Sequence, residues 1–134
     1  MVQFEGKYKH DKDENFEAIL EKSGAGFLMR KVATKAKPSI EVGIEGDTWT
    51  IQIVAAVKTV TWKFKLDEET EIETPEGKNK VMFELEGNKL TQRPLNKDNN
   101  KAMLIEREFT DEGLSQKMTH LASGTVGIRY FVRA

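Results

Sequence analysis

The chain has 134 residues, which is enough for one domain and too few for two of ordinary size. Charged residues make up 32% of the sequence but nearly cancel, to a net charge of −1, so no basic field favours binding to nucleic acid. Cysteine is absent, which excludes disulfides, thiolate metal sites and cysteine nucleophiles. No apolar run approaches the ~20 residues that span a bilayer, and the N-terminus lacks a secretory pattern, so we expect a cytoplasmic protein.

The N-terminal part of the chain predicts one strand followed by two short helices. The strand is expected from Phe4 to Lys9. Apolar residues then follow at helical spacing, with Asn15 or Asp13 available as the N-cap: Phe16, Ile19 and Leu20. A glycine-rich break precedes a second helix, expected over residues 27–36 and ended by Pro38. Neither helix is long enough to be stable alone, so we expect the two to pack over the open end of a barrel.

The rest of the chain predicts short antiparallel strands. Turn-forming residues recur at intervals of about ten residues, a spacing typical of sandwiches and barrels. They stand at 45–47, 75–77, 86–88, 98–100, 111–113 and 123–124. Between them apolar residues alternate with polar ones, as in strands with one buried face. The alternating apolar sets are Trp49, Ile51, Ile53, Ala55 and Val57, then Val60, Trp62, Phe64 and Leu66, then Val81, Phe83 and Leu85.

Several short motifs follow one another in a fixed order. They are Phe4-x-Gly6-x-Tyr8, Glu14-Asn15-Phe16-Glu17, Gly24-x-Gly26-Phe27, Arg30-Lys31-Val32-Ala33, Lys37-Pro38, Gly46-Asp47-x-Trp49, Phe64-Lys65-Leu66, Arg107-Glu108 and Arg129. Over nearly the whole chain this order resembles the intracellular lipid-binding proteins, the fatty-acid-binding family. The resemblance implies one all-β domain over residues 1–134, a ten-stranded antiparallel up-and-down β-barrel (clam) capped by a helix-turn-helix lid at about residues 15–36. It also implies an enclosed ligand, no cofactor and no catalysis.

A fatty acid needs apolar wall for its tail and a charge partner for its carboxylate, and the planar fork of arginine suits the second need. The resemblance implies that Arg107 and Arg129 bind the carboxylate. The family's headgroup tyrosine falls at Phe131 here, which removes one hydroxyl and leaves room for a retinoid, a sterol or another hydrophobic ligand. Gln116 is expected to add an inward amide.

The two arginines are not placed equally well by strand alternation. Alternation alone puts Arg129 outside, opposite a core face made of Val126, Ile128, Tyr130 and Val132. Arg107 shares its face with Met103, Ile105 and Phe109. The alternative for each arginine is a surface ion pair, or a head that stays in water while the stem covers apolar surface. The resemblance favours both pointing inward.

The remaining wall of the cavity is predicted from the resemblance and the alternation together. We expect it to include Phe16, Leu20, Met29, Ala33, Ile53, Ala55, Val57, Val60, Trp62, Gln116, Met118 and Phe131. Simple core packing is the alternative for each apolar member. Val57 stands where many members carry a phenylalanine over the portal, and the smaller side chain favours an open entrance.

Two other classes of function compete with a carrier. An enzyme is disfavoured, because the chain has only two histidines, no nucleophile elbow, and an acidic run at 67–73 that lacks EF-hand spacing for a metal. A membrane-surface or structural role remains open, because basic residues cluster on or beside the helices: Lys22, Arg30, Lys31, Lys35 and Lys37. The working hypothesis is a monomeric carrier that binds one long-chain fatty acid reversibly, transports it through the cytosol, and touches anionic membranes transiently through its lid.

Overall fold

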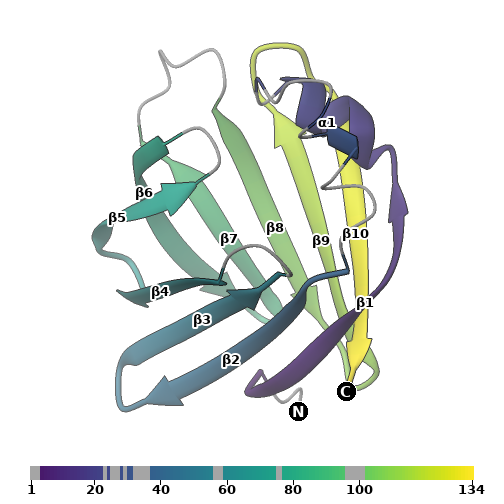
Figure 1. Cartoon of the computed structure of the whole chain (residues 1–134). Helices are drawn as coiled ribbons and strands as arrows, with labels where there is room; N and C mark the ends of the chain where they lie inside the picture. The colour runs from purple at the N-terminus through teal and green to yellow at the C-terminus, as the bar shows by residue number, and fades with distance from the viewer. Residues whose placement is uncertain are drawn as a thin grey trace.

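The computed structural model describes residues 4–22, 24, 28, 30–31, 37–55, 59–74, 77–95 and 102–134. Within these residues ten strands and one helix follow one another, and Figure 1 shows how they are arranged. Their bounds are β1 Gly6–Glu14, α1 Phe16–Lys22, β2 Ser39–Glu45, β3 Thr48–Val54, β4 Thr59–Lys65, β5 Glu69–Thr74, β6 Gly77–Glu86, β7 Lys89–Pro94, β8 Met103–Phe109, β9 Gly113–His120 and β10 Val126–Arg133.

All ten strands form one antiparallel sheet that curls into a nearly closed barrel (Figure 1). Each strand pairs with its neighbour in sequence, except that β1 pairs with β10 and β4 and β5 form the two edges. The indole Nε1 of Trp62 on β4 bridges these edges, since it donates to the backbone carbonyl of Glu73 on β5 at 3.0 Å. The predicted antiparallel barrel is therefore confirmed.

The alternation of apolar residues predicts the inner face of the barrel correctly. Trp49 and Ile51 are buried on β3, and Trp62 and Phe64 are buried on β4, in the parity expected for each strand. Of the predicted turns, the one at 86–88 joins β6 to β7, and its central Gly87 has a positive φ of 62°. The turn predicted at 98–100 lies outside the described residues, and so do residues 75 and 76 of the turn predicted at 75–77.

Strand β1 is longer than predicted and contains a bulge. It continues past Lys9 to Glu14, and its pairing with β10 shifts between His10 and Lys12. One extra residue, Asp11, is therefore inserted without a partner, which reverses the alternation of the strand beyond it. As a result Lys12 lies over the ring of Tyr130 on the outer face.

Helix α1 covers the end of the barrel formed by β9 and β10 (Figure 1). Phe16 and Ile19 are its buried residues. Asn15 comes directly before it, but its side chain does not cap the helix: its Nδ2 donates to the backbone carbonyl of Val126 on β10 at 2.7 Å. Gly127 on β10 permits this close approach, because a Cβ there would stand 2.6 Å from a side-chain carbon of Ile19. Of the predicted second helix, only residues 28, 30 and 31 are described, and all three are helical.

The core divides into two clusters at opposite ends of the barrel. The larger one, here called the floor, is built around stacked and tilted aromatic rings: Phe4, Tyr8, Trp49, Phe64, Phe83 and Phe109. The rings of Phe64 and Phe83 stack with centroids 3.7 Å apart. The smaller cluster lies under α1 and contains Phe16, Ile19 and Met118. The polar residues described next come from the part of the inner face between these clusters.

Candidate functional site

Four polar side chains form one row across the inner face of β1, β10, β9 and β8. Asp13 is directly opposite Arg129, Arg129 is opposite Gln116, and Gln116 is opposite Arg107. Residues that face each other across paired strands point to the same side of a sheet, so the row lies on one face. With one strand between them, the backbones of the two arginines are about 10 Å apart. We call these residues, together with Gln92 of β7, the arginine layer.

Arg107 lies just above the floor, opposite Leu90 of β7 and two residues from Phe109 along its own strand. Only 1% of its surface is exposed. Its Nη1 donates to the side-chain oxygen of Gln92 at 2.9 Å, and its Nε donates to that of Gln116 at 3.1 Å. Both acceptors are neutral amides, so they satisfy the donors of the guanidinium without balancing its charge.

Burial lowers the pKa of Arg107 to about 10. The group therefore remains charged at neutral pH. Across the described residues, no aspartate or glutamate forms an ion pair with it. The indole of Trp62 lies with its ring centroid 5.6 Å from the guanidinium carbon, a contact that offsets only part of the desolvation. A buried cation without an anionic partner is costly, and an incoming carboxylate would relieve that cost.

Arg129 is buried as well, but its surroundings differ. Its Nε donates to Oδ1 of Asp13 at 2.8 Å, and its Nη2 donates to Oδ2 of the same carboxylate at 3.4 Å. The guanidinium also stacks over the ring of Phe16, the first residue of α1, at 3.9 Å from the ring centroid. Asp13 thus gives Arg129 an anionic partner, and Arg107 has no such partner among the described residues.

His10 holds the Asp13 carboxylate from a second side. Its Nε2 lies 2.7 Å from Oδ1 of Asp13, and its ring meets that of Phe131 edge-on with centroids 5.7 Å apart. Burial by itself raises the pKa of the Asp13 carboxyl, but the hydrogen bonds and charges of Arg129 and His10 outweigh it and leave the pKa below its ordinary value. Asp13 is therefore ionised, and it is held between two side chains.

The structure buries the face of β10 that the resemblance implies. Gly127, Arg129 and Phe131 are buried, whereas Val126, Ile128, Tyr130 and Val132 are half-buried. The prediction from alternation alone, which put Arg129 outside, is wrong. It fails because the outer face of this strand also carries apolar side chains, so hydrophobicity does not distinguish the two faces.

The predicted wall residues are distributed around the same inner face. Phe16, Trp62, Met118 and Phe131 are buried, and Leu20, Ile53, Ala55, Val60 and Gln116 are half-buried. Ile53 and Val60 face each other across β3 and β4, beside the floor. Leu20 packs on the cluster beneath α1. Met29, Ala33 and Val57 lie outside the described residues.

The sequence did not single out Gln92, and it offered Asp13 only as a helix cap. Gln92 carries a readable signal, because it is a polar residue on the buried side of β7 between Leu90 and Pro94. Asp13 carries none. Its inward orientation depends on the bulge in β1, and regular alternation from Tyr8 would have pointed it outward.

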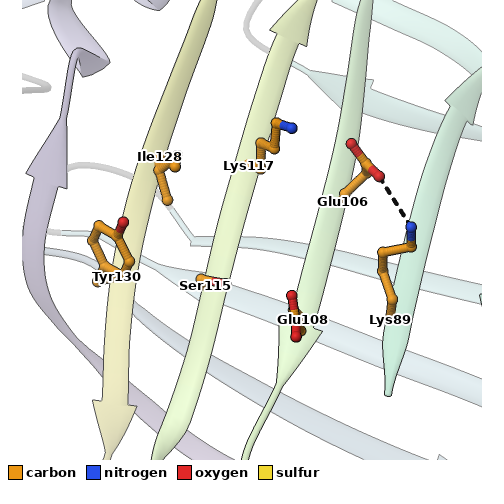
Figure 2. Close-up of a pocket in the computed structure, with 7 residues that line it drawn as sticks. All are labelled: Lys89, Glu106, Glu108, Ser115, Lys117, Ile128 and Tyr130. Carbon is orange, nitrogen blue, oxygen red and sulfur yellow. Dashed lines mark hydrogen bonds and ion pairs between the residues drawn. The ribbon is translucent and has the colours of Figure 1, made fainter. Parts of the chain in front are cut away.

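The opposite face of β7–β10 carries a shallow hollow of about 270 Å³, drawn in Figure 2. Seven residues line it: Lys89, Glu106, Glu108, Ser115, Lys117, Ile128 and Tyr130. Lys89 and Glu106 form an ion pair across it at 3.3 Å. Glu106 and Glu108 alternate with Arg107 along β8, so this hollow is on the outside of the barrel and contains none of the predicted site residues.

The described ranges contain neither a cluster of metal-ligand type nor a membrane-spanning helix. Within those ranges, no three His, Asp or Glu side chains gather as metal ligands would. No helix in that part of the chain is long and apolar enough to cross a membrane. His120 is buried, with Nδ1 2.6 Å from the hydroxyl of Ser123, in the loop that joins β9 to β10.

Comparison with curated proteins decides the family. The chain is 38% identical over 135 residues to a fatty acid-binding protein of Tyrophagus putrescentiae, with 99% of each chain covered. This chain belongs to the fatty-acid-binding protein family. It is also 34% identical over 138 residues to the human cellular retinoic acid-binding protein 2, with 99% of each chain covered. No protein-family model matches the sequence.

Solved structures of fatty-acid-binding proteins share this barrel. The fatty acid-binding protein from Drosophila melanogaster brain superimposes with a TM-score of 0.86 at 37% identity, over 97% of this chain and 99% of that one. The Schistosoma mansoni fatty acid binding protein in complex with arachidonic acid gives a TM-score of 0.89 at 26% identity, over 98% and 96% of the two chains. The relatives are thus lipid-binding proteins, and their barrel is the one described above.

Proposed function

We propose that this protein is a non-catalytic cytoplasmic carrier that binds one long-chain fatty acid reversibly within its barrel. The observation that carries the proposal is Arg107, a guanidinium with 1% of its surface exposed and only neutral amide acceptors among the described residues. A carboxylate beside it forms a charge-assisted pair at a buried position, where such pairs are strong. The relatives named for fatty acids support this choice of ligand.

The acyl tail is assigned to the apolar inner face between the floor and α1. Trp62, Met118 and Phe16 present buried apolar surface there, with the predicted wall residues around them. At about 25 cal/mol per Å² of apolar surface removed from water, the tail supplies most of the affinity and the carboxylate fixes the orientation. The family resemblance implies that Arg129 also binds the carboxylate, but Arg129 is already paired with the carboxylate of Asp13.

A retinoid is the second candidate ligand, and two observations favour it. Phe131 stands where the resemblance places a headgroup tyrosine, and it makes an apolar contact with the ring of His10. One of the relatives is named for retinoic acid. Retinoic acid also has a single carboxylate, so it would use Arg107 in the same way. A sterol or another neutral lipid would leave the Arg107 charge without a partner.

The experiment is a binding titration of the delipidated protein with palmitate, retinoic acid and hexadecanol. We expect palmitate to bind one per chain and more tightly than hexadecanol, and Arg107→Met to remove that preference. Arg93→Met is the matched control, because Arg93 pairs with Glu84 on the exposed outer surface. Tighter binding of retinoic acid would change the ligand and keep the site. No binding of any of the three, in a folded protein, would rule out the carrier.

Delivery and assembly are further parts of the proposal. We propose a monomer whose helical lid touches anionic membranes transiently, as the exposed Lys22 and Lys31 beside the lid favour. If the protein bound anionic vesicles equally with and without fatty acid, and had no affinity for fatty acid in its interior, a structural role at the membrane surface would replace the carrier.

A further inference from the structure

Two buried arginines share the arginine layer, and only one of them has a counter-ion within the described residues. Asp13 contacts Arg129 through both of its oxygens, at 2.8 and 3.4 Å. Arg107 has only Gln92 and Gln116 as side-chain acceptors. Counted over the row, two positive charges face one resident negative charge, so a single positive charge is left uncompensated.

Asp13 is held in this place by more than Arg129. The bulge between His10 and Lys12 turns it inward, and the cross-strand register sets it directly opposite Arg129. His10 binds its Oδ1 from the other side at 2.7 Å. The pKa of the Asp13 carboxyl remains below its ordinary value although burial opposes this, so the carboxylate is charged whenever a fatty acid would be.

We propose that Asp13 is a built-in counter-ion for Arg129 that determines which ligands the cavity accepts. It occupies the guanidinium that would otherwise attract a second negative charge, and it leaves Arg107 as the one anionic subsite. The cavity therefore selects lipids that carry a single carboxylate over neutral lipids and over dicarboxylates. This inference rests on the proposed function, because it concerns the same interior site.

The geometry also explains how a ligand would be positioned. A carboxylate at Arg107 lies close to the floor, in contact with the amides of Gln92 and Gln116, and its tail points towards α1 and Met118. A carboxylate at Arg129 would have to displace Asp13 from both the guanidinium and His10. That exchange replaces one ion pair by another and leaves Asp13 inside the barrel without its partner, which is unfavourable.

The test is a rescue experiment read by the affinity for palmitate. Arg107→Met alone should lower that affinity by about tenfold or more, as expected for the loss of a buried charge pair. Adding Asp13→Asn should restore about tenfold relative to Arg107→Met, because Arg129 then loses the carboxylate of Asp13 and can pair with that of the ligand. The matched control adds Asp47→Asn instead, which makes the same change of charge at an exposed turn residue, and it should restore nothing.

A merely structural role for Asp13 would produce no gain, so the rescue separates the two explanations. A folded double variant, Arg107→Met with Asp13→Asn, that binds palmitate no better than Arg107→Met alone would overturn the inference and leave the proposed function standing. If the native protein bound no lipid, the proposed function would fail first and the inference with it. Hexadecanedioate should bind the native protein more weakly than palmitate, because its second carboxylate meets no cation without a counter-ion in the arginine layer, and equally tight binding would count against the inference.

A second measurement uses the native protein, so it does not depend on whether the Asp13→Asn variant folds. In the native protein, the ¹⁵N resonance of the Arg107 Nε–H group should shift when palmitate is added, whereas that of Arg129 should stay near its position in the ligand-free state. Each resonance is assigned by its loss in the matching Arg→Met variant. A shift of the Arg129 resonance equal to or larger than that of Arg107 would show that the ligand displaces Asp13, and would overturn the inference.

Discussion

The arginine layer contains two regions, one around Arg129 and one around Arg107. Each is centred on an arginine of a predicted strand, but the two regions differ in their balance of charges. Around Arg129, strands β1 and β10 and the start of α1 supply a carboxylate, a histidine and an aromatic ring. Around Arg107, strands β7, β8 and β9 supply two amides and an indole. In the first region Arg129 has an acidic partner, whereas in the second Arg107 has none among the described residues. Under the proposed function, the missing counter-ion, rather than burial alone, marks the Arg107 region as the binding site for a carboxylate.

The largest expected effect contrasts the stabilities of two Arg→Met variants. Arg129→Met should lower the free energy of unfolding by about 3 kcal/mol, because it leaves the Asp13 carboxylate inside the barrel without its cation. Arg107→Met should change that free energy by no more than about 1 kcal/mol, since it removes a buried charge that has no acidic partner. Urea denaturation of the ligand-free proteins measures both.

The outer face provides the control for this contrast. Lys89→Met breaks the exposed pair with Glu106, and it should cost less than about 1 kcal/mol. If Arg129→Met and Arg107→Met lowered the free energy of unfolding equally, the proposed difference in charge balance between the two regions would be wrong.

The second prediction concerns a variant that gives Arg107 a carboxylate partner, as Asp13 gives one to Arg129. Gln92→Glu places a carboxylate where an amide oxygen now lies 2.9 Å from Nη1 of Arg107. The variant should lose about tenfold or more in palmitate affinity, or about 1.4 kcal/mol, because the subsite then has an internal counter-ion. Fluorescence or calorimetric titration measures the loss.

Gln52→Glu is the matched control for this substitution, since Gln52 bonds Thr61 at an exposed position on β3. The control should bind palmitate like the native protein. A Gln92→Glu variant that is folded and binds with native affinity would show that Arg107 is not the anionic subsite.

The smallest expected effect is a dependence of stability on pH that belongs to the Arg129 region alone. Because the pKa of Asp13 in the folded protein lies below its ordinary value of 3.8, the pair contributes fully above that pH. The contribution is lost as the pH falls below 3.8 towards the lowered value. Asp13→Asn should remove this part of the acid transition, measured as unfolding free energy between pH 5 and the acid limit.

Arg107→Met should leave the same acid transition intact, because Arg107 has no carboxylate partner within the described residues. An unchanged acid transition in the Asp13→Asn protein would show that the Asp13–Arg129 pair does not contribute in solution.

Local patterns determined most of the fold of this protein. Alternating apolar residues and turn residues such as Gly87 predict short antiparallel strands, because side chains on a strand point to opposite faces and sharp reversals favour residues that tolerate positive φ. The order of the motifs predicts the family, and comparison with relatives confirms it. Arg107 could be placed inside from its own strand, since Ile105 and Phe109 share its face.

Only the tertiary structure decided how the two arginines differ. The inward orientation of Asp13 depends on one unpaired residue in β1, and its partner Arg129 lies 116 positions further along the chain. No periodicity reports a bulge of one residue, and no spacing reports that the first strand pairs with the last. Charge balance inside a barrel is a property of strands brought together by closure of the sheet, so the sequence could name both arginines but could not show which of them already has a counter-ion.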